Sequence, residues 1–207
     1  AELLSNAKNP VILNGAGVVL SQGGINASRA LAERLDAPVC VGYQHNDAFP
    51  GSHPLFAGPL GYNGSKAGME LISDADVVLC LGTRLNPFST LPGYGMEYWP
   101  ADAKIIQVDI NPDRIGLTKK VTVGIVADAA KAANGILDRL SESAGDDGRA
   151  ERKAKIAEKK SRWAQQLSSM DHEDDDPGTT WNQRARADKP DWMSPRMAWR
   201  AIQSALP

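Results

Sequence analysis

A few residues that each follow a short apolar run are of the types that could bind a phosphate-bearing ligand. Gly82-Thr83-Arg84 comes directly after the apolar run Val77–Leu81, and Asp109 lies at the end of a later run. Glycine lets a ligand approach the backbone, arginine can hold a phosphate through two parallel hydrogen bonds, and a carboxylate accepts from ribose hydroxyls. A further turn follows residues 11–14. The predicted cofactor-binding residues are therefore Gly15, Ala16, Gly17, Gly82, Thr83, Arg84 and Asp109.

Each of these residues also has a purely structural interpretation, which the sequence leaves open. The glycines could serve only as strand-to-helix turns, Arg84 could form an ion pair, and Asp109 could cap the turn at Asn111-Pro112. The first turn reads GAGVVL, with Leu20 where the dinucleotide fingerprint G-x-G-x-x-G requires a third glycine. We therefore predict a nucleotide crevice that lacks the standard NAD fingerprint.

The rest of the sequence shows no catalytic or metal-binding constellation. His45 and His53 lie in a Gly- and Pro-rich stretch, residues 42–68, where no nucleophile or carboxylate is held beside them by spacing, so both are read as loop histidines. Cys40 and Cys80 fall inside apolar runs, which predicts buried, reduced thiols rather than a disulfide or a zinc pair. We predict no catalytic residue and no metal ligand.

Short apolar runs and amphipathic stretches predict the fold that would bring the three turns together. Runs at residues 11–14, 39–41, 77–81, 105–110 and 121–126 are typical of buried parallel strands, and residues 55–60 allow a sixth. Residues 23–35, 65–73 and 128–141 have helical spacing, with Ser21, Ser65 and Asp128 as N-caps. The prediction is an α/β fold with a three-layer, doubly wound parallel sheet of five or six strands and its crevice at the carboxyl ends.

Size and charge narrow the class of protein further. The chain has 207 residues, is 42% apolar and has a formal net charge of −2, which suits one α/β domain with an appendage. A net charge this close to zero gives no electrostatic reason to expect nucleic acid or a membrane surface as a partner. No apolar run approaches the ~20 residues that cross a bilayer, and no signal peptide is present, so a cytoplasmic location is expected.

The character of the chain changes after residue 143. Residues 149–162 contain seven basic and two acidic side chains with only a thin apolar stripe, which predicts a solvated helix. The run DHEDDD, residues 171–176, predicts a solvated acidic turn rather than a metal site. The extended, Trp-bearing residues 177–195 should lie on a surface, and Ser194-Pro195 should begin a final helix over residues 196–206. Truncation at Ser143 is expected to leave a folded core.

Five motifs, in order along the chain, resemble one enzyme family. The stretches PVILNGAG, HPLFAGPLGYNG, DADVVLCLGTRL, AKIIQVDINPDRIG and VGIVADA are similar to the central domain of thiamine-diphosphate-dependent enzymes of the acetolactate synthase and pyruvate oxidase group. The resemblance covers residues 1–143 and implies a DHS-like variant of the Rossmann fold. Residues 144–193 would then be a charged helix and extended linker, and residues 194–207 the start of the pyrophosphate-binding domain.

The resemblance also implies a cofactor and partners that lie outside this segment. The parent enzyme would use thiamine diphosphate and Mg²⁺, activated by a glutamate in the preceding domain and held by a Gly-Asp-Gly motif in the following one. Gly145-Asp146-Asp147-Gly148 is one residue too long for that motif, so this segment alone is expected to be inactive. Its partners would be the N-terminal and C-terminal cofactor domains of the same chain, in a homodimer or homotetramer.

The family leaves two readings of the crevice open. In relatives that bind FAD or ADP, the nucleotide lies at strand ends that match Gly82-Thr83-Arg84 and Asp109. The crevice of this chain would either bind such a nucleotide or be vestigial. A sirtuin-like NAD enzyme shares the fold class, but two isolated cysteines provide no zinc module for it.

Overall fold

The computed structural model describes residues 1–144, 148–172 and 195–206. Contacts within the chain divide it into two units, Ala1–Lys160 and Ser161–Pro207. The first unit contains the whole sheet, and the described part of the second is helical except for Leu206. None of the described helices is long and apolar enough to cross a membrane.

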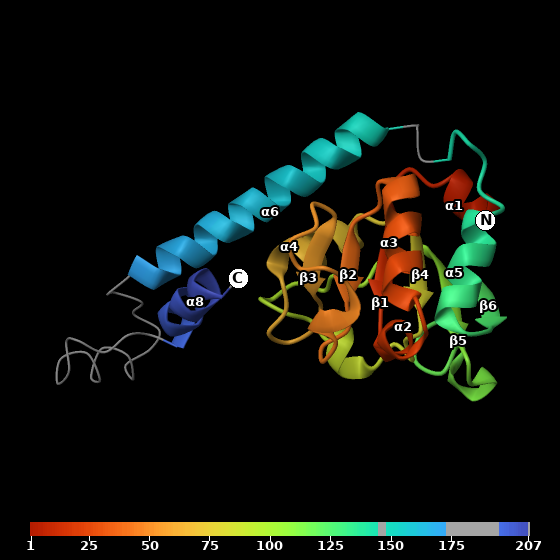
Figure 1. Cartoon of the computed structure of the whole chain (residues 1–207), viewed down its shortest axis with the longest axis horizontal. Helices are drawn as coiled ribbons and strands as arrows, with labels where there is room; N and C mark the ends of the chain where they lie inside the picture. Colours follow the sequence, from red (N-terminus) through yellow and green to blue (C-terminus); the bar gives the residue numbers. More distant parts are fainter. Residues whose placement is uncertain (145–147, 173–194, 207) are drawn as a thin grey trace. The chain divides into compact units, whose positions relative to one another are not determined.

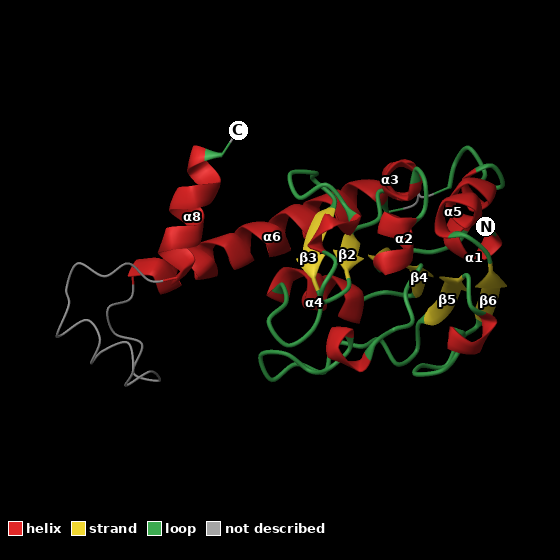
Figure 2. Ribbon diagram, turned by 60° about the horizontal axis from the view of Figure 1, so that its bottom comes forward, coloured by secondary structure: helices red, strands yellow, loops and turns green. Residues whose placement is uncertain are grey.

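Six parallel strands form the centre of the first unit, in the order β3-β2-β1-β4-β5-β6 (Figures 1 and 2). Strand β1 lies between β2 and β4, so the winding reverses at the β1–β4 pair, as the doubly wound prediction requires. The sixth strand that residues 55–60 allowed is present as β3. The strands are β1 Pro10–Asn14, β2 Val39–Val41, β3 Phe56–Pro59, β4 Val77–Leu81, β5 Lys104–Asp109 and β6 Val123–Val126.

Helices cover both faces of this sheet and give the three layers. Helices α3 (Gly24–Leu35) and α5 (Ala129–Leu137) pack against each other on one face, while α4 (Lys66–Ser73) lies on the other (Figure 2). Every residue of β1, β2 and β4 is buried, because apolar side chains meet helices on both sides. The shorter elements are α1 Glu2–Ser5, α2 Ala16–Leu20, and the 3-10 turns η1 Asn46–Ala48, η2 Pro87–Ser89 and η3 Pro112–Arg114.

Two of the three predicted N-caps are confirmed. The Ser65 hydroxyl accepts from the Gly68 N–H at the start of α4, and the Asp128 carboxylate accepts from the Lys131 N–H at the start of α5. The prediction that Ser21 caps α3 is wrong. An extra helix, α2, ends just before Ser21, and the N-cap of α3 is Gly23, whose backbone is in the left-handed conformation. Helix α5 ends at Leu137 rather than residue 141, and β6 begins at Val123 rather than residue 121.

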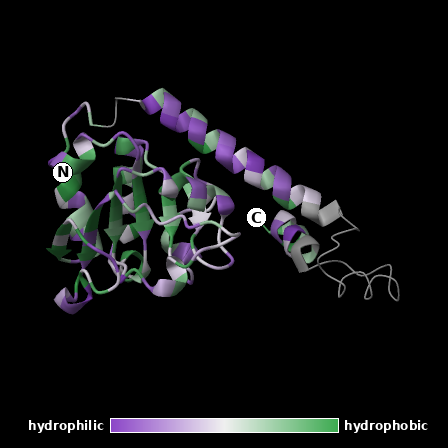
Figure 3. Cartoon of the chain, turned by 180° about the vertical axis from the view of Figure 1, so that it is seen from behind, coloured by the Kyte–Doolittle hydropathy of each residue, from purple (hydrophilic) through white to green (hydrophobic). Residues whose placement is uncertain are grey.

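The basic stretch forms helix α6, Arg149–His172, which is mostly hydrophilic along its length (Figure 3). The prediction of a solvated helix is wrong for its first half, because Arg152 and Ile156 are each only 4% exposed within the first unit. The acidic residues after His172, the extended stretch and the Ser194 cap lie outside the described residues. The final helix, α8, covers Pro195–Ala205 and exposes Trp199 and Ile202.

Candidate functional site

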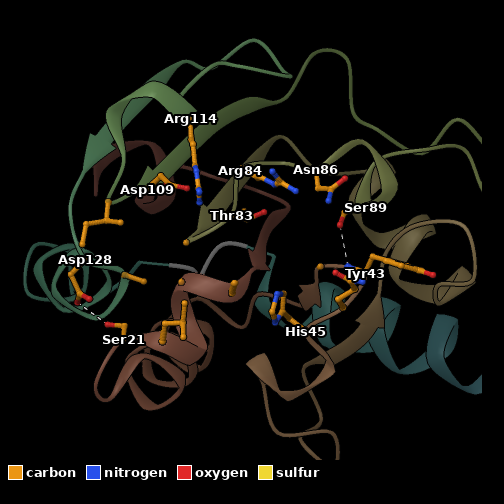
Figure 4. Close-up of a pocket in the computed structure, with 18 of the residues that line it drawn as sticks. Ser21, Tyr43, His45, Thr83, Arg84, Asn86, Ser89, Asp109, Arg114 and Asp128 are labelled. Atoms are coloured by element: carbon orange, nitrogen blue, oxygen red, sulfur yellow. Dashed lines mark hydrogen bonds between the residues drawn. The ribbon is translucent and has the colours of Figure 1, made fainter.

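A crevice of about 500 Å³ lies at the carboxyl ends of five strands (Figure 4). Its walls come from the turns that follow β1, β2, β4, β5 and β6, so segments far apart in sequence meet there. This confirms the predicted position at the reversal of the winding. The lining residues include Ala16, Gly17, Leu20, Ser21, Tyr43, His45, Gly82, Thr83, Arg84, Asn86, Ser89, Asp109, Ile110, Arg114 and Asp128.

The glycines of the two central turns pack backbone against backbone. The Gly15 N–H donates to the Leu81 carbonyl at 2.9 Å, and the Gly17 N–H donates to the Gly82 carbonyl at 2.8 Å. A Cβ atom on Gly17 would lie 2.6 Å from the Gly82 Cα, and a Cβ atom on Gly82 would lie 2.5 Å from the Gly17 Cα. The interlocked turns therefore require these glycines whether or not a ligand binds. Of the predicted residues in the first turn, Ala16 and Gly17 line the crevice and Gly15 does not.

Gln107, which the sequence analysis did not select, holds the floor of the crevice together. Its side-chain amide donates to the Thr83 and Arg114 carbonyls at 3.0 Å each, and its carbonyl oxygen accepts from the Gly116 N–H at 2.9 Å. The side chain is 1% exposed and uses its hydrogen bonds entirely within the domain. The sequence offered one indication of this role, a single glutamine among the apolar residues of the strand KIIQVD, where a buried amide needs hydrogen-bond partners.

Two arginines supply the positive charge of the crevice. Arg84 extends from the turn after β4 and Arg114 from η3, which follows β5 (Figure 4). Both residues are exposed, and among the described residues neither guanidinium has a hydrogen-bond or ion-pair partner. The alternative of a structural ion pair for Arg84 therefore finds no partner in this part of the chain. Arg114, which the sequence analysis missed, doubles the charge available to an anion.

Asp109 already has a structural role. Its Oδ1 atom accepts from the Asn111 N–H at 2.9 Å, and the residue is 4% exposed. The turn-capping interpretation that the sequence left open is therefore correct for this oxygen. Asp109 also lines the crevice.

Ser21 and Asp128 join the ends of two distant helices at another wall of the crevice. The Ser21 hydroxyl donates to Asp128 Oδ1 at 2.7 Å and accepts from the Ala130 N–H at 3.0 Å, so it caps α5 rather than α3. Hydrogen bonds from the Lys131 N–H and the Ser21 hydroxyl hold the pKa of Asp128 below its ordinary value. Ser21 was predicted as a cap, but for the wrong helix.

The remaining wall is aromatic and polar. The Tyr43 N–H donates to the Ser89 hydroxyl at 3.0 Å, and the Tyr43 and Phe88 ring centroids are 6.3 Å apart. His45 lines the crevice, with its Nδ1 atom 3.8 Å from the Asp47 carboxylate. His53 does not line it, and its Nε2 atom lies 3.2 Å from the Glu33 carboxylate.

The thiols are buried, as predicted. Burial raises the pKa of Cys40 to about 12 and raises that of Cys80 as well, so both thiols stay protonated at neutral pH. Across residues 1–144, 148–172 and 195–206, no three His, Cys, Asp or Glu side chains gather closely enough to hold a metal ion.

Comparison with known proteins defines the class of this fold and crevice. The family model described as "Thiamine pyrophosphate enzyme, central domain" matches residues 1–136, so the chain belongs to this family. Over all 207 residues the chain is 78% identical to sulfoacetaldehyde acetyltransferase from Roseovarius nubinhibens and 48% identical to the enzyme of that name from Castellaniella defragrans. These matches cover 34% and 35% of the two relatives.

More distant relatives share the fold with lower identity. A probable acetolactate synthase large subunit from Methanocaldococcus jannaschii is 35% identical over 68% of this chain and 23% of its own length. A crystal structure of a putative thiamin diphosphate-dependent enzyme from Mycobacterium smegmatis superposes with a TM-score of 0.55 at 30% identity, covering 69% of this chain and 27% of the other. The chain thus spans about a third of the length of the curated relatives that it matches along its whole length.

Proposed function

We propose that this chain is the central-domain segment of a sulfoacetaldehyde acetyltransferase. The full-length protein would convert sulfoacetaldehyde and phosphate into acetyl phosphate and sulfite in the cytoplasm, with thiamine diphosphate and Mg²⁺ as cofactors. The observation that carries the proposal is the 78% identity to an enzyme of that name along all 207 residues, without a gap in coverage. The segment would contribute no catalytic residue of its own.

Within that enzyme, the segment would act by holding its neighbours in place. The described residues do not fit the Mg²⁺ that accompanies thiamine diphosphate, because no three His, Cys, Asp or Glu side chains among them gather closely enough to hold a metal ion. No chemical step is therefore assigned to this segment. Its rigid parallel sheet, buried on both faces, would space the N-terminal and C-terminal cofactor domains in a homodimer or homotetramer.

The test is an assay of the full-length protein with sulfoacetaldehyde, phosphate, thiamine diphosphate and Mg²⁺. We expect equal amounts of sulfite and acetyl phosphate, each dependent on the cofactor. The 207-residue segment serves as the control and should release neither product. A full-length protein that binds thiamine diphosphate but releases no sulfite would refute the assignment of substrate.

A second candidate function is nucleotide binding. It is favoured by the two crevice arginines, whose guanidinium groups have no hydrogen-bond or ion-pair partner among the described residues. An ADP or FAD pyrophosphate could pair with Arg84 and Arg114, and Asp109 could accept from a ribose hydroxyl. Calorimetry of the segment with ADP and with FAD tests this. Arg84→Ala should weaken binding tenfold or more, whereas Arg139→Ala, which removes an exposed arginine bonded to the Gly135 carbonyl, should not. No heat with either ligand would show that the crevice is vestigial.

A further inference from the structure

Two helices of the central domain end at an aspartate, whose negative charge is unfavourable at a helix C-terminus. Asp36 is the C-cap of α3 and Asp74 is the C-cap of α4. The peptide dipoles of a helix leave partial negative charge and unpaired carbonyls at this end, so a carboxylate there is destabilising unless a cation compensates. Both residues stand at the amino ends of the strands, on the edge of the sheet opposite the crevice.

The first half of α6 places two cations on each of these aspartates. Asp36 pairs with Arg149, Nε to Oδ2 at 2.9 Å, and with Lys153, Nζ to Oδ1 at 3.2 Å. Asp74 Oδ2 pairs with Lys155 at 2.9 Å and with Lys159 at 3.2 Å. The two acidic helix ends are therefore neutralised by one segment that lies more than 70 residues further along the chain.

The same segment also occupies backbone carbonyls at these helix ends. Arg149 donates to the Arg34 carbonyl and Arg152 donates to the Leu35 carbonyl, each at 3.2 Å, at the end of α3. Lys159 donates to the Glu70 carbonyl of α4 at 3.3 Å. The basic side chains thus supply donors to the carbonyls that a helix leaves unpaired at its C-terminus.

The inward face of this half-helix is basic, which reverses the usual amphipathic pattern. Arg152 is 4% exposed and donates to the Lys8 carbonyl at 3.0 Å as well as to α3. Ile156 is the apolar anchor, also 4% exposed, and it joins the hydrophobic core. The space left around it is only about 20 Å³ and is lined by Pro10, Val11, Pro38 and Leu71.

We propose that residues 149–160 form a cationic clasp that completes the central domain by closing the C-termini of α3 and α4. The folded domain then extends to Lys160, and truncation at Ser143 would leave two acidic helix ends without cations and uncover the site of Ile156. Because charge holds the clasp, salt loosens it more than it loosens the apolar core. The clasp belongs to the segment itself and does not depend on the proposed enzymatic activity.

Hydrogen exchange of the 207-residue chain, read by mass spectrometry, tests the clasp. The double variant Asp36→Asn/Asp74→Asn keeps the shape of both C-caps, and asparagine tolerates the left-handed conformation of Asp36, φ 47°. We expect amides of residues 150–160 to exchange at least tenfold faster in this variant. Raising NaCl from 0.1 to 1 M should accelerate the same amides in the wild type.

Asp138→Asn is the matched control, because Asp138 is the C-cap of α5 and, among the described residues, no basic side chain of α6 reaches it. It should leave exchange in residues 150–160 unchanged. The variant Lys155→Gln/Lys159→Gln removes both cations from Asp74 and keeps its carboxylate, and it should also accelerate exchange in residues 150–160. The clasp is overturned if both double variants leave residues 150–160 as protected as in the wild type, or if Asp138→Asn accelerates them equally.

Discussion

Replacing Gly82 by alanine tests whether the crevice turns are built by backbone packing. Gly82 has φ +57°, and an added Cβ would meet three backbone atoms of Gly17 and Val18 at 2.5–2.9 Å, none of which can move without shifting the turn. The left-handed conformation costs about 1–2 kcal/mol for a residue with a side chain, and overpacking costs about 1–3 kcal/mol more. We therefore expect Gly82→Ala to lower the free energy of unfolding by about 2–5 kcal/mol.

Alanine substitutions at two further glycines separate the cost of the left-handed conformation from the cost of overpacking. Gly95 has φ +72° with no atom within 4 Å of an added Cβ, so Gly95→Ala should cost only the conformational part, about 1–2 kcal/mol. Gly17 lacks the positive φ but would clash with the Gly82 Cα at 2.6 Å, so Gly17→Ala should cost only the packing part, about 1–3 kcal/mol.

Urea unfolding followed by circular dichroism measures all three variants. If Gly82→Ala costs no more than Gly95→Ala, the two turns can separate to admit a side chain. The interpretation that interlocked packing requires these glycines would then be wrong.

Three other predictions follow from the described contacts. Native Cys40 and Cys80 should resist iodoacetamide at pH 8 and react only after unfolding, because burial raises both pKa values, that of Cys40 to about 12; rapid labelling of the folded chain would contradict this. Asp128→Asn should lower the urea midpoint more at pH 7 than at pH 3. The lowered pKa of Asp128 means that its contribution is present above the ordinary Asp value near 4 and disappears as pH falls through the folded value, so an equal effect at both pH values would refute the charged cap. Gln107→Leu should cost about 2–4 kcal/mol by leaving the Thr83 carbonyl and the Gly116 N–H without their partner, and a cost below about 1 kcal/mol would mean that water replaces the glutamine.

The elements that sequence predicted well are those whose signals are local. Apolar runs of three to six residues between turn residues identified the strands, because burial on both faces demands continuous apolar sequence. Ser65 and Asp128 were recognised as N-caps because a cap bonds only a few residues ahead. Ser21 was assigned to the wrong helix because its actual partner, the Ala130 N–H, is 109 residues away.

The candidate site was predicted in position but not in how its residues are used. The turns after β1 and β4 were expected at one crevice, and they meet there because parallel strands bring their carboxyl ends to one edge. Arg114 and Gln107 were missed although both lie in the stretch AKIIQVDINPDRIG, because local sequence does not show what they reach in space. Only the fold brings Arg114 to the crevice and the Gln107 amide to the Thr83 carbonyl.

By itself, the sequence determined the α/β class, the parallel sheet and the turns at its carboxyl edge, because hydrophobic periodicity and turn chemistry act over short distances. Only the tertiary structure decided that the crevice glycines serve to pack two turns, since that depends on backbone atoms of segments 65 residues apart in sequence. The tertiary structure also decided that the first half of α6, whose composition is typical of a solvent-exposed helix, packs against the domain through basic side chains. Composition describes how many charges a helix carries, whereas their partners, here two acidic helix ends, are set by the fold.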